Sequence, residues 1–276
     1  DTIVCGSAEK ETIAALVKGI AEACRENDCS LVGGETSIQP SVVEHGVYVL
    51  TSSIAGIADR TQIIDGSRTE ENDAVLAVAS NGLHTNGYSL VRLLMDRMPE
   101  IKLDRVGGMT FIEQIMKPHT PYYKAIRGLF GKGLLHGMAH ITGGGLEGNI
   151  TRVIPDGLCA EIELSRLRVP EIFRYIRSHG NISDEEMLRT FNCGAGFCLI
   201  VPEKYKDRAC EPQLCLLRDR QDCEGCRKKD CVRRTRKLAV DIRKNSYSRS
   251  VLPAKCGFQP GRPRFFGSSN PILISL

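Results

Sequence analysis

A strand, a glycine-bearing loop and a helix are predicted in direct succession over residues 74–95. Residues 74–79 form an apolar run, and residues 88–95 repeat apolar side chains at helical spacing. A loop that enters a helix presents backbone N–H groups, and the helix dipole adds to their attraction for an anion. An ordinary strand–helix turn is the alternative interpretation. If the loop binds phosphate, the residues that face it are His84, Asn86 and Gly87.

Two more glycine loops follow apolar stretches and extend this hypothesis. Residues 30–36 are predicted as a short strand that runs into a glycine loop, and residues 137–146 repeat the strand–glycine–helix order. Three such loops would suit several phosphate groups, as in a nucleotide together with a phosphorylated substrate. The alternative is that these glycines only form tight turns. The candidate phosphate-binding residues of the two loops are Gly33, Gly34, Thr142, Gly143, Gly144 and Gly145.

Three polar residues beside the loops are candidates for chemistry. The Glu35 carboxylate is a hard oxygen ligand that suits Mg²⁺ next to phosphates, or else it is an exposed carboxylate at the start of a helix. His84 can donate to a phosphate or act as a general acid or base, although a solvated loop histidine is the alternative. His140, at a strand end, is at least equally well explained as a buried, hydrogen-bonded histidine.

The remaining pattern predicts alternating strands and helices through residue 206, which indicates an α/β or α+β body. A turn at 65–67 is followed by a charged stretch, and we place a domain boundary there. The other predicted elements are helices at 8–26, 122–130, 169–178 (with Pro170 in its first turn) and 184–189 (with Ser183 as N-cap), and strands at 46–58 and 196–201.

Charge and cysteine content set the last part of the chain apart. Residues 207–276 carry 16 lysines and arginines against 7 acidic residues, whereas residues 1–206 carry 21 against 26. Six of the 12 cysteines also lie in this tail, but its Cys223-x2-Cys226 pair has no second CxxC and no histidine to complete a zinc site. Its basic clusters could attract nucleic acid, although no recognisable nucleic-acid module frames them. We interpret the tail as atypical, and disordered or frameshifted.

Composition excludes some classes of protein for residues 1–206. No apolar run approaches the roughly 20 residues that a bilayer-spanning helix needs. No secretory signal pattern is present at the start, and the first residue is Asp1, which favours a fragment or a processed chain. The cysteines of this part lie mostly in apolar segments, which suits reduced thiols in the cytoplasm.

The loop sequences, taken together, resemble one enzyme family. The family is phosphoribosylformylglycinamidine cyclo-ligase, also called aminoimidazole ribonucleotide synthetase, and the resemblance covers residues 1–206. Related ATP-using enzymes of the same superfamily match these motifs less well. The segments that carry the resemblance occur in order: 29–36 (CSLVGGET), 63–67 (IIDGS), 84–92 (HTNGYSLVR), 140–145 (HITGGG) with 149–155 (NITRVIP), and 189–194 (RTFNCG).

The resemblance implies a two-domain α/β (α+β) protein of purine biosynthesis. Residues 1–66 would be part of an N-terminal ATP-binding and dimerisation domain, and residues 67–206 a C-terminal domain that binds substrate and phosphate. The reaction would be the ATP- and Mg²⁺-dependent ring closure of formylglycinamidine ribonucleotide in a cytoplasmic homodimer. By resemblance, Glu35 is a metal or substrate ligand, His84 and Asn86 line the substrate side, with His84 as the acid–base group, and residues 142–145 form a second anion loop.

Two departures from the family modify this expectation. Family members carry a long segment before the position of Asp1, with metal ligands and much of the ATP site, and residues 207–276 do not resemble the family's closing elements. We therefore expect this polypeptide to be weakly active or inactive. The alternative function is a non-catalytic phosphate-binding module whose basic tail contacts nucleic acid.

Overall fold

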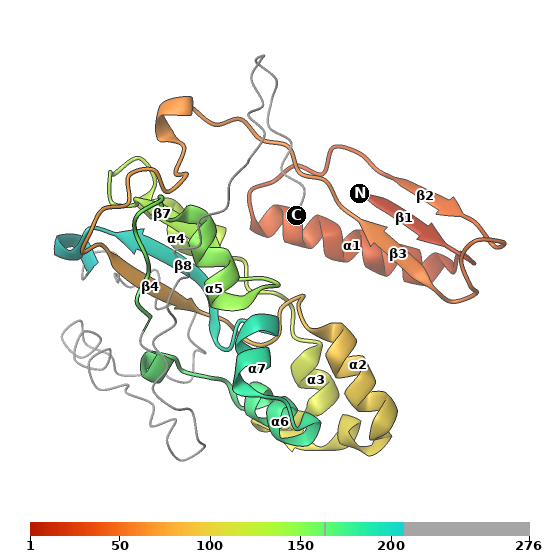
Figure 1. Ribbon diagram of the computed structural model, residues 1–276. Coiled ribbons are helices and arrows are strands. Elements are labelled where there is room, and N and C mark those ends of the chain that lie inside the picture. Colours follow the sequence, from red (N-terminus) through yellow and green to blue (C-terminus); the bar gives the residue numbers. More distant parts are fainter. Residues whose placement is uncertain (163, 207–276) are drawn as a thin grey trace. The chain divides into compact units, whose positions relative to one another are not determined.

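The computed structural model describes residues 1–162 and 164–206. The described residues divide into two compact units, Asp1–Thr61 and the residues from Gln62 onward. Figure 1 shows the first unit in red to orange and the second in orange, through yellow and green, to cyan. The predicted atypical tail, residues 207–276, lies outside the described residues.

The first unit is a three-stranded sheet with one long helix. Strands β1 (Thr2–Cys5), β2 (Glu35–Ile38) and β3 (Tyr48–Thr51) are arranged in the order β2-β1-β3. β1 is parallel to β2 and antiparallel to β3. Helix α1 (Lys10–Glu26) connects β1 to β2 and runs alongside the strands in Figure 1, which confirms the helix expected there.

The strand expected at 30–36 is wrong, because β2 begins only at Glu35 and the glycines precede it. The cause is the pairing with β1, which the sequence pattern did not predict. The amide of Glu35 donates to the carbonyl of Asp1 at 3.1 Å, and a Cβ atom on Gly34 would lie 2.4 Å from the same oxygen. Gly34 is therefore the point at which the two strands come close enough to pair. β3 is also shorter than the strand expected at 46–58.

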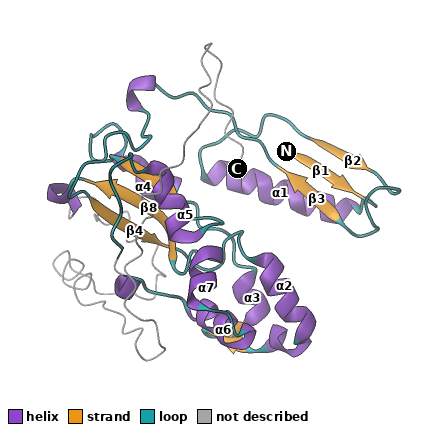
Figure 2. Ribbon diagram, in the orientation of Figure 1, coloured by secondary structure: helices purple, strands orange, loops and turns teal. Residues whose placement is uncertain are grey.

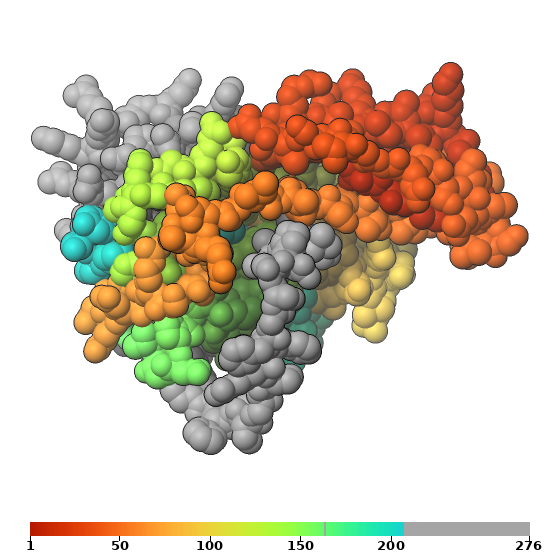
Figure 3. Space-filling view, turned by 90° about the horizontal axis from the view of Figure 1, so that it is seen from above, coloured from red at the N-terminus to blue at the C-terminus, as the bar shows by residue number. Residues whose placement is uncertain are grey.

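The first unit buries little of its apolar surface. Within the described part of the chain, no residue of α1 is buried. After β3 the chain continues to a short 3₁₀ helix, Arg60–Gln62. Figure 3 shows this part of the chain as a narrow orange band. Exposed apolar side chains of this unit include Val32, Ile38, Val42, Val49, Leu50 and Ile57.

The second unit is built on an antiparallel sheet whose central strand comes last in the sequence. β8 (Ala195–Val201) lies between β4 (Ala74–Ala79) and β7 (Gly137–His140), and it is antiparallel to both. All but one residue of β8 are buried, because both faces of this apolar strand are covered. The strands expected at 74–79 and 196–201 are confirmed.

Four helices form a second core beside this sheet, and Figure 2 shows them gathered in one group. They are α2 (Tyr88–Arg97), α3 (Phe111–Ile115), α6 (Glu171–Gly180) and α7 (Asp184–Thr190). Their shared core includes fully buried Phe111, Phe173 and Met187. Thr110 and Glu113 form a capping box at the start of α3, and the short hairpin β5 (Arg105–Val106) and β6 (Met109–Thr110) precedes it.

Several helix boundaries differ from those expected. The helix expected at 122–130 is α4 (Tyr123–Ile126) followed by a 3₁₀ turn, Arg127–Leu129. Pro170 is the N-cap of α6 instead of a first-turn residue, whereas Ser183 caps α7 as predicted and accepts from the Glu186 amide. The remaining helices are α5 (Gly145–Ile150) and the 3₁₀ segments Pro99–Leu103, Thr151–Val153, Leu164–Arg166 and Glu203–Tyr205.

Candidate functional site

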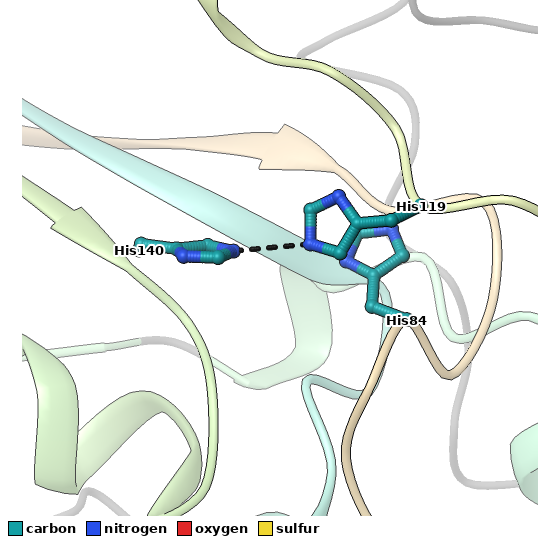
Figure 4. Close-up of side chains that lie close together, drawn as sticks. All are labelled: His84, His119 and His140. Atoms are coloured by element: carbon teal, nitrogen blue, oxygen red, sulfur yellow. Dashed lines mark hydrogen bonds between the residues drawn. The ribbon is translucent and has the colours of Figure 1, made fainter. Parts of the chain in front are cut away.

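Three histidines meet at one end of the sheet of the second unit (Figure 4). Because β4 and β7 are both antiparallel to β8, they run in the same direction and their carboxyl ends lie at the same edge. His84 lies in the loop after β4, and His140 is the last residue of β7. His119, from the segment between α3 and α4, completes the group.

The three imidazoles lie within ligand distance of one another. One ring nitrogen from each residue lies within 4.8 Å of the other two. The Nε2 atoms of His119 and His140 are 3.2 Å apart, and the rings of His84 and His119 have centroids 3.9 Å apart. Figure 4 shows one ring nitrogen of His84 and one of His119 on the side that faces His140, and its dashed line marks the hydrogen bond between His119 and His140. The cluster is also mostly enclosed, since His84 is buried and the other two are half-buried.

Hydrogen bonds to the outer ring nitrogens define the tautomers of two of these histidines. The Asn81 amide nitrogen donates to the carbonyl of Pro118 at 2.9 Å. The Asn81 amide oxygen therefore faces His84 and accepts a hydrogen bond from His84 Nε2 at 2.9 Å. His119 Nδ1 likewise donates to the carbonyl of Thr120 at 2.8 Å. Each neutral ring therefore presents an unshared electron pair on its other nitrogen. The His84 Nδ1 atom is buried and has no hydrogen-bond partner among the described residues.

Burial keeps the three histidines uncharged. Desolvation, reinforced by the neighbouring imidazoles, lowers the pKa of His84 to about 3. Burial also lowers the pKa of His119 and that of His140. At neutral pH the cluster is therefore a set of neutral imidazoles. In this state His84 is a hydrogen-bond acceptor at Nδ1, and its role as a phosphate donor or as a general acid or base stays a prediction.

Tyr122 and Gly196 pack against His84. The Tyr122 hydroxyl donates to the carbonyl of Ala79 at 3.1 Å, and burial raises the pKa of this phenol. A Cβ atom on Gly196 would lie 1.8 Å from the Tyr122 oxygen and 2.7 Å from the Cε1 atom of His84. Gly196 thus makes room on the central strand for both rings.

A buried asparagine holds the loop that carries His84. Asn192 donates through its amide nitrogen to the carbonyls of Gly82 and Leu83, at 2.9 and 3.4 Å. Its amide oxygen accepts from the Ser80 hydroxyl at 2.6 Å and from the Gly194 amide at 2.9 Å. His84 itself has a left-handed backbone, with φ of 59°. A non-glycine residue rarely adopts this conformation, so the surrounding contacts impose it.

The predicted glycine loop at 142–145 lies beside the His84 loop. A Cβ atom on Gly143 would lie 3.8 Å from the amide oxygen of Asn86. Asn149, which is buried in α5, stabilises the turn by donating to the carbonyls of Thr142 and Gly145, at 3.3 and 2.7 Å. The Thr142 hydroxyl donates in return to the Asn149 amide oxygen at 3.1 Å. Two of the three predicted loops are therefore adjacent.

Several of the predicted anion-binding glycines have structural roles. The amide of Gly144 donates to the carbonyl of Arg189 and that of Gly145 to the carbonyl of Thr142, so both are already engaged within the protein. Gly87 has φ of 79°, and a Cβ atom there would lie 2.1 Å from the ring of Phe191. Close packing and turn geometry therefore explain why glycine occupies these positions. Phosphate binding by the two loops stays a prediction.

Gly33, Gly34 and Glu35 belong to the first unit, whereas the histidine cluster belongs to the second, and the assignment of these three residues to a nucleotide site stays a prediction. Glu35 is exposed at the start of β2. Sequence analysis missed His119 because no glycine loop or apolar run adjoins it. The available signal was its position between Pro118 and Pro121, where an irregular segment can place a side chain beside strand ends.

Comparison with known families agrees with this architecture. The family described as AIR synthase related protein, C-terminal domain, matches residues 70–211, which is just over half of the chain. The chain belongs to the AIR synthase related family. The corresponding N-terminal domain of the family matches residues 1–58. The family resemblance expected from the sequence is thereby confirmed, and so is the α/β (α+β) fold.

Two curated relatives that are similar to the chain carry the name of one enzyme. The chain is 44% identical over 201 residues to phosphoribosylformylglycinamidine cyclo-ligase of Methylobacillus flagellatus, covering 73% of this chain and 58% of the relative. It is 41% identical over 210 residues to the enzyme of that name from Burkholderia cenocepacia, covering 76% and 60%. The chain thus spans about three-fifths of the length of these relatives.

A solved structure of low sequence identity is also similar. Thiamine-monophosphate kinase from Stenotrophomonas maltophilia matches with a TM-score of 0.49 and 16% identity, covering 75% of this chain and 62% of that chain.

Two further properties concern the described residues as a whole. None of their helices is long and apolar enough to cross a membrane, and all six of their cysteines are free thiols.

Proposed function

We propose that the protein acts in the ATP-dependent ring closure of formylglycinamidine ribonucleotide to aminoimidazole ribonucleotide, a step of purine biosynthesis. The observation that carries this proposal is the 44% identity to a cyclo-ligase over 201 residues. In the reaction, ATP phosphorylates the formyl oxygen of the substrate. A substrate nitrogen then attacks the same carbon, loses a proton, and phosphate leaves.

The residues that we assign to the substrate side are His84, Asn86 and the loop at 142–145. His84 Nδ1 carries an unshared electron pair with no partner among the described residues, so it can accept a hydrogen bond from the nitrogen that must lose its proton. Asn86 lies next to Gly143 and offers an amide for hydrogen bonding to the sugar or phosphate of the nucleotide.

ATP and Mg²⁺ are the cofactors that the proposed reaction requires. When bound, they supply the phosphoryl group and neutralise its developing charge. Glu35 is exposed and belongs to no group of three metal-ligating side chains among the described residues. A single carboxylate fits Mg²⁺ only where phosphate oxygens and waters complete the octahedron. We therefore assign Glu35 as a ligand for Mg²⁺ that arrives with the nucleotide, together with backbone groups of Gly33 and Gly34.

A cytoplasmic homodimer is the assembly that we propose. The support comes from the first unit, whose exposed apolar side chains include Val49 and Leu50 on β3 and Ile38 on β2. A surface of this kind is typical of an interface between subunits. Sedimentation of the purified chain should give twice the monomer mass, and a monomer at all concentrations would contradict the proposal.

Activity is tested by incubating the purified chain with ATP and formylglycinamidine ribonucleotide and measuring aminoimidazole ribonucleotide and ADP. We expect ring closure at a low rate that His84→Ala reduces by about 100-fold, the usual contribution of an acid–base group. His45→Ala, which removes an exposed histidine of the first unit, is the control and should leave the rate unchanged. ADP release without ring closure, or equal rates in both variants, would contradict the assigned role of His84.

The family relationship does not favour the alternative of a nucleic-acid-binding module. Calorimetry with formylglycinamidine ribonucleotide separates the two functions even if turnover is slow. Substrate binding that survives deletion of residues 207–276 supports the enzyme. Salt-dependent DNA binding that the deletion abolishes, without any substrate binding, would support the module instead.

A further inference from the structure

We propose that His84, His119 and His140 form a binding site for a single Zn²⁺ ion, in addition to any function of these residues in ring closure. Their nitrogens lie within 4.8 Å of one another, and the group is the one such cluster of three or more metal-ligating side chains among the described residues. The three ligands come from three separate segments, as Figure 4 shows.

The spacing suits a tetrahedral ion. Zn²⁺ binds imidazole nitrogen at about 2.0–2.1 Å, which places two tetrahedral ligands about 3.3 Å apart. The Nε2 atoms of His119 and His140 are already 3.2 Å apart, joined by a hydrogen bond whose proton the ion would replace. Since the three ligand nitrogens lie within 4.8 Å of one another, the His84 nitrogen needs to approach by at most about 1.5 Å. Three protein ligands leave the fourth position open for water or another small ligand.

The outer hydrogen bonds are those that a metal site requires. A histidine that binds a metal usually donates its second ring N–H to a carbonyl or carboxylate, which orients the ring and fixes the tautomer. His84 donates to the amide oxygen of Asn81, and His119 donates to the carbonyl of Thr120. In both residues the nitrogen that faces the cluster therefore carries an unshared electron pair.

These electron pairs favour a cation over an anion. A phosphate at the same place would need hydrogen-bond donors, but the inner nitrogens of His84 and His119 are acceptors in the observed arrangement. The inner N–H of His140 is already donated to His119 Nε2. The His84 Nδ1 atom is moreover buried with no partner among the described residues, and an unsatisfied buried polar atom is costly. A metal ion would remove this cost.

The ligand set also selects the metal. Imidazole nitrogen suits Zn²⁺ and its transition-metal neighbours, whereas Mg²⁺ prefers oxygen ligands and retains water. The cluster contains no carboxylate. Zinc bound here would thus be distinct from the Mg²⁺ proposed to accompany ATP. It would also occupy the electron pair of His84 Nδ1, so zinc should inhibit any ring closure that uses this atom.

The test is a titration of the metal-free chain, residues 1–276, with Zn²⁺ and with Co²⁺, which reports tetrahedral coordination by its visible absorption. The titration contains neither ATP nor substrate, so its result does not depend on the proposed function. All proteins carry Cys223→Ser and Cys226→Ser, because this CxxC pair could bind zinc separately. We expect one tightly bound ion per chain and no competition by Mg²⁺.

Matched variants assign the bound ion to the cluster. His119→Ala and His140→Ala should weaken binding by at least about 100-fold, and His45→Ala should leave it unchanged. Asn81→Ala keeps all three ligands but removes the hydrogen bond to His84, so it should weaken binding by about 10–100-fold. This variant is informative even if a histidine variant fails to fold. Absence of binding, or equal binding in the histidine and His45 variants, would overturn the proposal. Binding of inorganic phosphate to the metal-free chain that the same histidine variants abolish would also overturn it, in favour of an anion site.

Discussion

The amide nitrogen of Asn192 donates a hydrogen bond of 2.9 Å to the carbonyl of Gly82, 110 residues earlier in the chain. Asn192 precedes the central strand β8, and Gly82 lies in the loop that carries His84. The bond therefore connects the strand that organises the sheet to the loop that organises the candidate site. Asn192 is completely buried, so water does not replace it as a hydrogen-bond partner. The groups that bond to it therefore depend on its side chain.

Replacing Asn192 with alanine should destabilise the second unit by about 2–3 kcal/mol. The change removes the partner of the Gly82 carbonyl and of the Gly194 amide, and buried groups without partners bear the full cost of desolvation. Urea unfolding followed by circular dichroism measures the difference. Ser80→Ala removes only one bond of the same group and should cost about 1 kcal/mol or less. Equal losses of unfolding free energy in the two variants would contradict the role of Asn192 in holding the His84 loop.

Two glycines of α5 should respond in opposite ways to alanine. Gly145 has φ of 62°, and a Cβ atom there would lie 1.7 Å from the carbonyl oxygen of Leu188. Gly145→Ala should therefore cost about 2–4 kcal/mol through backbone strain and a clash. Gly148, in the same helix, has nothing within 4 Å of the position of a Cβ atom. Gly148→Ala should be neutral or stabilise the protein by up to about 1 kcal/mol. Thermal unfolding of both variants gives the comparison, and a similar loss for Gly148→Ala would contradict it.

The buried thiols should resist alkylation while Cys159 reacts. Burial raises the pKa of Cys193 and that of Cys198 to about 12, and the Cys193 thiol also lies near the carbonyl of Met187, at 3.5 Å. At about pH 8 only on the order of one such thiol in 10⁴ is ionised, and the thiolate is the reactive form. Cys159 is exposed. Iodoacetamide labelling followed by peptide mass spectrometry distinguishes the sites, and early modification of Cys193 in the folded protein would contradict the assignment.

The same thiols predict a loss of stability in alkali. Both raised pKa values lie near 12, whereas the ordinary thiol value is 9.0. Between these values the unfolded chain releases the two protons and the folded chain keeps them, so the free energy of unfolding falls as the pH rises. The stabilising contribution is complete below about pH 9. Urea unfolding at several pH values should show a shallower decline in a variant with both Cys193→Ala and Cys198→Ala. An unchanged slope would contradict the prediction.

Local pattern alone predicted the elements that define the family. Residues 74–79 are a strand and residues 88–95 a helix, because a short continuous apolar run and an apolar spacing of 3.6 are each a property of the segment itself. Helix α1 was predicted for the same reason, and the cap at Ser183 from the preference of serine for the position before a helix. The ordered motifs identified the relationship to the AIR synthase related family, since they are read directly from the chain.

Only the tertiary structure decided which of these residues meet. The insertion of β8 between β4 and β7 aligns the carboxyl ends of two strands and so brings His84 to His140, with His119 added by a segment that has no periodicity. The pairing of β1 with β2, which moved the expected strand to Glu35, is likewise a long-range contact. Strand order and loop contacts depend on packing between segments far apart in sequence, and no local pattern encodes them. The sequence alone therefore determined the family and most elements, while the packing of distant segments decided the composition and the neutral charge state of the histidine cluster.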